Sequence, residues 1–169
     1  MPDSFQIQQQ MYSRWCWAAV GASTKLYLSP DSPLTQCRLA ARVTGDDGCC
    51  DAHLPPGLDR SEPLQNALDD ASVPYQTLPG IALAFAAIRT QINESLPVCA
   101  RIGWPGQNAG HFVVVYGFGV SPSGEQWVDI ADPFYGYWTV PYEYFIHSYQ
   151  GDGEWTDSFL VQAPPAGGK

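Results

Sequence analysis

The sequence of 169 residues has the length of one ordinary globular domain and is long enough to bury a substantial core. Hydrophobic residues make up 45% of it and charged residues only 15%, which indicates a folded chain rather than a disordered one. The formal net charge of -9 argues against nucleic acid and against an anionic membrane surface as partners, because both would repel this chain.

The first ten residues, MPDSFQIQQQ, are polar. They lack the basic start and the apolar run of a signal peptide, so we expect none in this chain. No later stretch reaches the apolar length of a transmembrane helix. These features leave the location of the protein undetermined.

Helical signals fill the first part of the chain, up to about residue 95. Ser13, Ser32 and Ser61 are N-cap candidates at the starts of three of the helices, because serine side chains accept hydrogen bonds from the first free N–H groups. The expected helices cover about 13–28, 32–45, 61–68 and 82–92. The segment 46–60 is rich in Gly, Pro and Asp and is expected to be an irregular loop.

After Pro97 the pattern changes to short β-branched or aromatic runs bounded by Gly, Pro or Asp, which is typical of strands. The expected strands cover 97–104, 111–120, 126–132, 137–140 and 158–163, with SPSG at 121–124 as a hairpin loop. Helices followed by antiparallel strands predict an α+β fold. We expect a single domain over 1–169, with a helical half at about 10–95 and a sheet half at about 96–163.

Cys16 lies between two tryptophans and just before a run of alanines. If Ser13 is the N-cap, Cys16 is the third residue of its helix, where free N–H groups and the helix dipole favour a negative charge. Both effects favour the thiolate, which is the reactive form of cysteine. On this segment alone, a buried and inert cysteine between packing tryptophans is at least as good an explanation.

A nucleophilic cysteine needs a base, and the chain has three histidines. His53 lies in the acidic loop and His147 in a polar segment, so we expect both at the surface. His111 follows Gly110 and opens the most apolar strand, HFVVVYGF, so it would be held as rigidly as a base must be. A strand-edge histidine with no chemical role is the alternative.

The predicted hairpin supplies a partner for His111. With SPSG as a four-residue loop, paired positions sum to 245, so His111 faces Phe134 and Asp132 is its diagonal neighbour on the same face. Asp132 can then hold the imidazole in the right tautomer, whereas Asp129 should point away. A loop one residue shorter or longer would turn Asp132 off this face unless a bulge restored the register.

An oxyanion donor is expected near the cysteine. Gln10 lies six residues before Cys16, so its side-chain amide and the Cys16 backbone N–H can face a developing oxyanion. Gln8 and Gln9 lie close enough in sequence to leave the choice among the three open.

Three segments together resemble papain-like cysteine proteases. They are Gln10 to Ala19 (Q-x5-C-W-A-A), GHFVVVYGF at 110–118 and DPFYG at 132–136. The sequence is most similar to the bacterial family that contains the avirulence effector proteases of plant pathogens, over about residues 8–140. The second half is also similar to bacteriocin-leader peptidases.

The resemblance implies a papain-like fold and a role for each residue. It makes Cys16 the nucleophile, His111 the general base and acid, Asp132 the orienting group and Gln10 the oxyanion donor. It also points to a bacterial protein that is secreted or translocated. The aspartate at position 132 departs from papain itself, which has asparagine at that place in the triad.

The remaining cysteines raise the question of a disulfide or a metal. The segment TQCRLA at 35–40, followed by Cys49-Cys50, also resembles the effector family. We expect Cys37 to lie near Cys49 and Cys50, either in a disulfide or as buried thiols. With His53 these cysteines suggest zinc, but adjacent cysteines rarely both turn toward one ion, so we expect neither a metal nor a cofactor.

Large aromatic residues are candidates for the walls of a substrate cleft. Trp17, Trp104, Gly110 and Trp138 are the candidate substrate-binding residues, and the loop WPGQNAG at 104–110 is the best candidate for a wall beside His111. Tryptophans that simply pack in the core are the alternative.

We therefore expect a cysteine peptidase that acts on peptides or proteins through an acyl-enzyme. We expect it to be a monomer and to need no cofactor. The same residues can also pass the acyl group to an amine, as in a transpeptidase or transglutaminase, or deamidate glutamine. An inactive papain-like module that binds peptides is the alternative outside enzymes.

Overall fold

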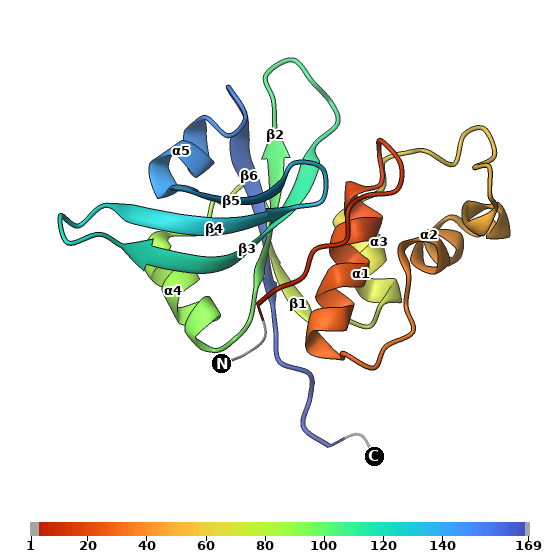
Figure 1. Cartoon of the computed structure of the whole chain (residues 1–169), viewed down its shortest axis with the longest axis horizontal. Helices are drawn as coiled ribbons and strands as arrows, with labels where there is room; N and C mark the ends of the chain where they lie inside the picture. Colours follow the sequence, from red (N-terminus) through yellow and green to blue (C-terminus); the bar gives the residue numbers. More distant parts are fainter. Residues whose placement is uncertain (1–3, 168–169) are drawn as a thin grey trace.

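The computed structural model describes residues 4–167, and one lobe of this part of the chain is helical (Figure 1). Its elements are α1 (Cys16–Leu28), α2 (Gln36–Thr44), a short 3-10 helix η1 (Asp47–Cys50) and α3 (Leu64–Asp70). Helix α1 is buried along its first nine residues, which explains its small side chains. At Gly21 an added Cβ would lie only 2.8 Å from the Cβ of Ala67, so glycine permits the close approach of α1 and α3.

The helix starts differ in detail from the prediction. Trp15 is the N-cap residue of helix α1, and its side chain makes no capping hydrogen bond. Helix α2 is capped by Thr35, which accepts a hydrogen bond from the backbone N–H of Arg38. The expected caps Ser13 and Ser32 are therefore wrong, because each hydroxyl makes a different hydrogen bond. The expected end of α2 at Gly45 is confirmed, and this glycine has the positive φ of 73° that such a C-cap requires.

The second lobe is built on a six-stranded antiparallel sheet. Its strands lie in the order β1-β6-β2-β3-β4-β5. They are β1 (Tyr75–Leu78), β2 (Val98–Gly103), β3 (His111–Val120), β4 (Gln126–Asp132), β5 (Gly136–Pro141) and β6 (Glu154–Val161). The five strands expected from the sequence are all present, whereas β1, at one edge of the sheet, was not predicted.

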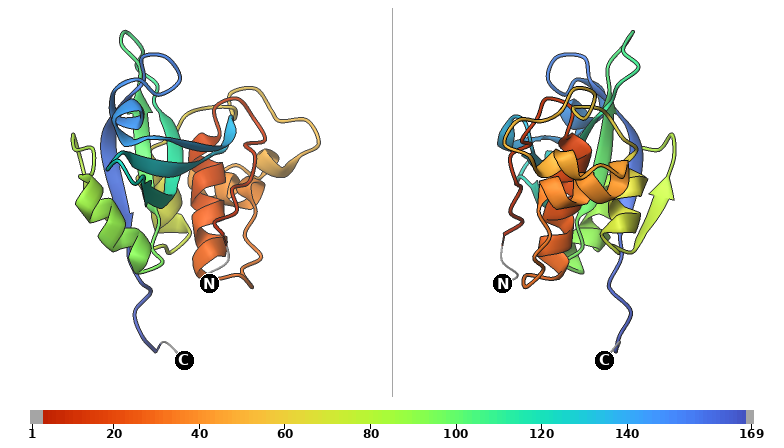
Figure 2. Two further views of the ribbon diagram at one scale, coloured as in Figure 1. Left: turned by 60° about the vertical axis from the view of Figure 1, so that its left-hand side comes forward. Right: turned by 90° about the vertical axis from the view of Figure 1, so that its right-hand side faces the viewer.

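Helices cover both faces of the sheet (Figure 2). Alternate residues of β3 divide between two hydrophobic clusters: Phe112 and Val114 pack with α1, whereas Val113 and Val115 pack with α4 (Phe85–Asn93) and α5 (Tyr142–His147). Helix α4 matches the expected helix at 82–92 with a later start, and α5 was not predicted. The cluster that contains α1 joins the two lobes, so it fixes α1 against the sheet.

The β3–β4 hairpin corrects the predicted register and explains why the prediction for Asp132 still succeeds. Val120 pairs with Gln126, so the loop has five residues and the positions near it sum to 246 rather than 245. The register shifts between Val115 and Gly117, and beyond this bulge Val115 pairs with Ile130. The bulge thereby restores the sum of 245 at the end of the hairpin that carries His111.

Helices in the first part of the chain and an antiparallel sheet after them confirm the α+β fold class. Within residues 4–167, no helix is both long and apolar enough to cross a membrane.

Candidate active site

Cys16 is the first residue of α1, rather than the third, and its side chain is 7% exposed. The helix starts later than expected, and Ser13 does not cap it, because its hydroxyl bonds to another segment of the chain. The carboxylate of Asp59 accepts hydrogen bonds from the Ser13 hydroxyl at 2.6 Å and from the Arg14 backbone N–H at 2.8 Å. Cys16 still lies at the helix N-terminus, where the backbone N–H groups and the helix dipole favour a negative charge.

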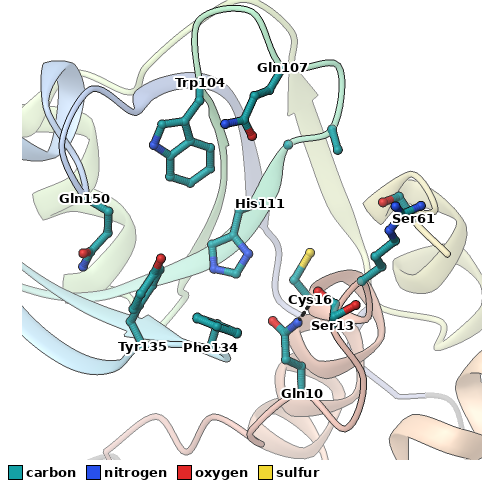
Figure 3. Close-up of a pocket in the computed structure, with 13 residues that line it drawn as sticks. Gln10, Ser13, Cys16, Ser61, Trp104, Gln107, His111, Phe134, Tyr135 and Gln150 are labelled. Carbon is teal, nitrogen blue, oxygen red and sulfur yellow. Dashed lines mark hydrogen bonds between the residues drawn. The ribbon is translucent and has the colours of Figure 1, made fainter. Parts of the chain in front are cut away.

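His111 is the first residue of β3, as predicted, and Asp132 is the last residue of β4. The imidazole Nε2 donates a hydrogen bond of 2.8 Å to Oδ1 of Asp132. The Asp132 side chain has no exposed surface and that of His111 is 14% exposed. Figure 3 shows the other side of the imidazole turned toward the Cys16 sulfur. The predicted cysteine, histidine and aspartate therefore lie in one row.

The electrostatics of this row favour a charged histidine. Burial lowers the pKa of His111, but hydrogen bonds to Asp132 and Cys16 and electrostatic attraction to both outweigh it and raise the pKa to about 9. Burial acts on Asp132 in the opposite sense by raising its pKa, yet the hydrogen bond and charge of His111 hold the pKa of this carboxyl below its ordinary value. At neutral pH the pair is therefore an imidazolium and a carboxylate.

Asp132 is held by more than His111. Its Oδ1 also accepts hydrogen bonds from the backbone N–H groups of Phe134 at 2.8 Å and Tyr135 at 3.0 Å, which belong to the turn after β4. Its Oδ2 accepts a hydrogen bond of 2.7 Å from the Tyr149 hydroxyl. Asp129 has the opposite orientation, as predicted, and accepts a hydrogen bond from Thr139.

Gln10 is the one among the three candidate glutamines that lines the cavity beside Cys16. Its Nε2 donates hydrogen bonds of 2.9 Å to the carbonyl oxygens of Tyr12 and Ser13, and its Oε1 is buried without a partner. Its backbone N–H donates to the carbonyl of Pro133 at 2.9 Å, which ties this segment to the turn after Asp132. Gln8 accepts a hydrogen bond from Gln36 instead.

The site opens into a cavity of about 460 Å³ at the junction of the two lobes (Figure 3). Trp104 and Gly110 line it, as expected, and the rings of Trp104 and Tyr135 flank the His111 ring at centroid distances of 6.4 Å each. The residues that line it are Gln10, Ser13, Arg14, Cys16, Ser61, Trp104, Gln107, Ala109, Gly110, His111, Phe134, Tyr135 and Gln150. None of them is acidic, although the whole chain carries a net charge of -9.

Two of the expected substrate-binding residues lie outside this cavity. Trp17 is fully buried, and its indole N–H donates a hydrogen bond to the carbonyl of Arg60, so it packs in the core. Trp138 lies on β5 with 45% of its surface exposed, and its indole N–H donates to the carbonyl of Tyr135. Neither side chain lines the cavity beside Cys16.

The two tryptophans beside Cys16 have a shared structural role. The indole N–H of Trp15 donates to the carbonyl of Leu58, and that of Trp17 donates to the carbonyl of Arg60. Asp59, between those two residues, accepts hydrogen bonds from Ser13 and Arg14, just before α1. The segment 58–60 is thus fixed along the start of α1.

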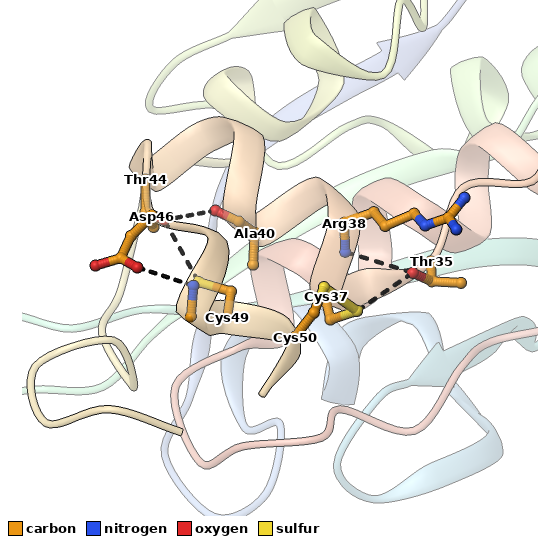
Figure 4. The surroundings of a disulfide bond; sticks show 9 residues. Thr35, Cys37, Arg38, Ala40, Thr44, Asp46, Cys49 and Cys50 are labelled. Atoms are coloured by element: carbon orange, nitrogen blue, oxygen red, sulfur yellow. Dashed lines mark hydrogen bonds between the residues drawn. A yellow bond between two sulfur atoms is a disulfide. The ribbon is translucent and has the colours of Figure 1, made fainter. Parts of the chain in front are cut away.

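A disulfide joins Cys37 of α2 to Cys50 of η1, which resolves the pairing that the sequence left open (Figure 4). Cys49 is buried and unpaired, with its sulfur 3.4 Å from the hydroxyl of Thr44. Cys99 is also a buried free thiol, and burial raises its pKa to about 12, so it is a poor nucleophile.

Sequence reasoning missed Asp59 and Tyr149. Asp59 contacts residues 45 and 46 positions earlier in the chain, and Tyr149 contacts a residue 17 positions earlier, across another helix. No local sequence motif predicts either contact. A single acidic residue or tyrosine in an irregular segment belongs to no periodic pattern, so the sequence does not identify it as a contact of the site.

Comparisons with known proteins agree with this geometry. A sequence profile of the family described as papain-like cysteine protease AvrRpt2 matches residues 1–150. The bromelain protease from Ananas comosus, solved in complex with the E64 inhibitor, superposes with a TM-score of 0.55 at 12% identity, over 95% of this chain and 94% of that chain. No curated protein sequence gives a significant match.

A second solved structure has the same fold. The proform of the Amb a 11 cysteine protease, a major ragweed pollen allergen, superposes with a TM-score of 0.52 at 14% identity, over 94% of this chain and 62% of that chain. These structural likenesses show the papain-like fold, and the family profile covers most of the sequence. The chain therefore belongs to the papain-like cysteine protease AvrRpt2 family and is a cysteine peptidase that acts on peptide or protein substrates.

Proposed function

We propose that Cys16, His111, Asp132 and Gln10 carry out the peptidase reaction, with Cys16 as the nucleophile. The observation that carries this proposal is a cysteine at a helix N-terminus that lines one cavity with His111, whose imidazole makes a 2.8 Å hydrogen bond to the buried Asp132. The other two free cysteines are buried elsewhere and do not line it.

The reaction begins with the Cys16 thiolate and the His111 imidazolium as an ion pair. The sulfur adds to the carbonyl carbon of the scissile peptide bond, and the electron pair of the C=O bond moves to oxygen. When the C–N bond breaks, His111 donates its proton to the leaving amine and the acyl group stays on sulfur as a thioester. Water then attacks the thioester while His111 takes its proton, and the carboxylic acid and the free cysteine are released.

Asp132 keeps the imidazole usable in both steps. Because Nε2 donates to Asp132, the other ring nitrogen is left to exchange its proton with Cys16 and with the leaving group. The carboxylate also stabilises the imidazolium, which agrees with the raised pKa of His111.

Gln10 and the Cys16 backbone N–H are the proposed oxyanion donors. Both amide protons of Gln10 are bound to the carbonyls of Tyr12 and Ser13, so one of them must turn to the oxyanion when it forms. This exchange costs little, because a charge-assisted hydrogen bond to the oxyanion replaces a neutral one. Such a donor then stabilises the transition state more than the bound substrate.

We also propose that the chain acts as a monomer and as one peptidase domain over 1–169. The catalytic row draws one member from the helical lobe and two from the sheet, so either lobe alone would lack part of it. Light scattering after size-exclusion chromatography tests the monomer, and a single cooperative unfolding transition tests the single domain.

The experiment that tests the catalytic roles measures alkylation of each cysteine by iodoacetamide, with the labelled peptide identified by mass spectrometry. We expect rapid labelling of Cys16 alone in the native protein, and a loss of this selectivity in His111→Ala. Cys49→Ala is the matched control, because it removes a buried thiol outside the cavity. Similar labelling of all three free cysteines, independent of His111, would show that the assignment is wrong.

Hydrolysis is measured with fluorescein-labelled casein as the substrate. We expect cleavage by the native protein and none by Cys16→Ala. Adding a primary amine separates hydrolysis from acyl transfer, because a transferase forms an amide product that mass spectrometry detects. Selective alkylation of Cys16 without any cleavage product would favour a protein that binds peptides without hydrolysing them.

A further inference from the structure

Tyr149 is a large buried side chain that the proposed reaction does not use. It follows α5 and has no exposed surface. Its ring packs edge-on against Phe145, with the centroids 5.3 Å apart. Its backbone N–H and carbonyl both bond to Gly153, at 2.9 and 3.0 Å, which closes the turn between α5 and β6.

The surroundings of this turn leave it little freedom. A Cβ added at Gly153 would lie 2.5 Å from the carbonyl oxygen of Tyr149 and 2.9 Å from the Trp104 ring. The turn is thus packed directly against Trp104, which in turn flanks His111. Gln150, the next residue, has a positive φ of 50° and lines the cavity. The backbone of Tyr149 is therefore held in place from several sides.

The hydroxyl, the one polar group of the Tyr149 side chain, contacts Asp132. The Tyr149 hydroxyl donates a hydrogen bond of 2.7 Å to Oδ2 of Asp132, whereas His111 and the two turn N–H groups all bind Oδ1. In the described chain, Tyr149 is the one hydrogen-bond donor to Oδ2. The torsion that turns a carboxylate about its Cβ–Cγ bond is soft, so a bond to the second oxygen adds to the resistance against rotation that the bonds to Oδ1 provide.

Burial and the charge of Asp132 raise the pKa of Tyr149 far above its ordinary value, so the phenol keeps its proton and remains a donor. The phenol also lowers the pKa of Asp132 through the hydrogen bond that it donates. A hydrogen bond to a charged acceptor is shorter and stronger than one between neutral groups, in keeping with the 2.7 Å distance.

We propose that Tyr149 is a positioning residue of the peptidase, which fixes the plane of the Asp132 carboxylate and through it the imidazole of His111. The inference rests on the catalytic roles proposed above. Tyr149 does not line the cavity, and its hydroxyl bonds to Asp132, so the effect of the hydroxyl passes through Asp132. A buried tyrosine that only stabilises the fold is the competing explanation.

The variant Tyr149→Phe separates the two explanations, because it removes one oxygen and keeps the ring. Tyr142→Phe is the matched control: Tyr142 is also buried, and its hydroxyl donates a hydrogen bond of 2.8 Å to the carbonyl of Leu83, away from the cavity. The readout is the rate of Cys16 alkylation by iodoacetamide at neutral pH, which needs no knowledge of the natural substrate. A thermal unfolding curve for each variant defines the temperatures at which all of them are folded, and rates are compared there.

We expect Tyr149→Phe to lower the Cys16 alkylation rate about 10-fold or more, within the range of about 10 to 100-fold found when groups that orient site ligands are removed. Tyr142→Phe should leave the rate unchanged. In an Asp132→Ala background, Tyr149→Phe should cause no further loss, because the group through which it acts is absent. With casein as the substrate, the loss should fall on kcat rather than KM.

Two results would overturn the proposal. One is an equal alkylation rate in Tyr149→Phe and Tyr142→Phe, and the other is a full 10-fold effect of Tyr149→Phe in the Asp132→Ala background. Failure of the proposed function looks different, since native protein would then leave casein intact or label its cysteines without selectivity. The rate comparison between the two tyrosine variants needs no casein cleavage.

Discussion

Replacing Asp132 by asparagine tests the electrostatic part of the mechanism, because it removes the charge and keeps the shape. The amide oxygen can still accept the hydrogen bonds that Oδ1 accepts from His111 and from the turn after β4. The imidazolium, however, loses the carboxylate 2.8 Å from its Nε2, while the burial that lowers the pKa of His111 remains.

The magnitude follows from that contact. An opposite charge within about 4–6 Å changes a pKa by about 1–3 units. This pair is closer than that and almost fully buried. His111 must be protonated to release the leaving amine, so the native enzyme should lose activity as the pH rises through about 9. In Asp132→Asn this alkaline limb should move about 1–3 pH units toward acid.

The assay is kcat/KM for casein peptides as a function of pH, since this ratio reports groups of the free enzyme. Asp129→Asn is the matched control, because Asp129 lies on the same strand but bonds to Thr139. It should leave the alkaline limb where it is. An alkaline limb at the same pH in the native enzyme and in Asp132→Asn would refute the assignment of His111 and Asp132.

Stability should follow the same pair. The pKa of folded His111, about 9, lies above its ordinary value of 6.5, so its contribution to stability is complete below about pH 6.5 and is lost as the pH rises through 9. The lowered pKa of Asp132 gives the opposite case: its contribution is present above its ordinary value of 3.8 and is lost as the pH falls through the folded value. Urea unfolding of the native enzyme should therefore show a decline in stability between about pH 6.5 and pH 9 that is much smaller in Asp132→Asn.

Three further changes test the scaffold of the site. Asp59→Ala removes the hydrogen bonds to Ser13 and Arg14, just before α1, and should lower the free energy of unfolding by about 1–2 kcal/mol, measured by urea denaturation. Gly117→Ala places a Cβ 2.2 Å from a carboxylate oxygen of Asp129 at the bulge and should cost about 1–3 kcal/mol, whereas Gly119→Ala on the same strand meets no atom within 4 Å and should cost much less. Reduction of the disulfide between residues 37 and 50, 13 positions apart, should lower the free energy of unfolding by about 3 kcal/mol, and a double serine variant should show no response to reductant.

The sequence predicted the parts of the fold that depend on local patterns. The strand at 111–120 and the strand at 126–132 match β3 and β4 residue for residue, because alternating β-branched and aromatic residues are bounded there by Gly, Pro and Asp. Strand β1 was missed because it has only four residues and lies at the edge of the sheet, a short way after α3. Its pairing with β6 joins positions that are far apart in the chain.

In the site, too, residues in local patterns were predicted, whereas details that depend on long-range pairing were not. Cys16, His111 and Asp132 were predicted from a helix start, a strand mouth and a hairpin register, and the structure brings them together. The register argument was wrong near the loop, where a fifth loop residue shifts the pairing, and the bulge at residues 115–117 compensates for it. Gly117 is the residue that permits this bulge beside Asp129, but one glycine in a strand does not reveal which way the register shifts.

The resemblance to papain-like proteases identified one residue that the spacing along the sequence could not. It selected Gln10 from three neighbouring glutamines, and Gln10 is the one that lines the cavity. It did not indicate how the tryptophans act. Trp17 was expected at a substrate wall, yet an indole N–H that must be satisfied in the core finds the carbonyl of Arg60 instead.

The long loop between α2 and α3 is fixed at two points, and this bears on whether the peptidase cleaves other copies of itself. A peptidase is always surrounded by copies of itself, and exposed irregular segments are the usual sites of proteolytic cleavage. Here the disulfide fixes the loop at Cys50, while the indoles of Trp15 and Trp17 fix it again at residues 58–60. Only residues 51–57 lie between the anchors, and they include Pro55 and Pro56. A segment this short, held at both ends, has little freedom to adopt the conformation that a peptide needs to enter the cleft, so we expect the contacts that hold α1 also to limit self-digestion of this loop.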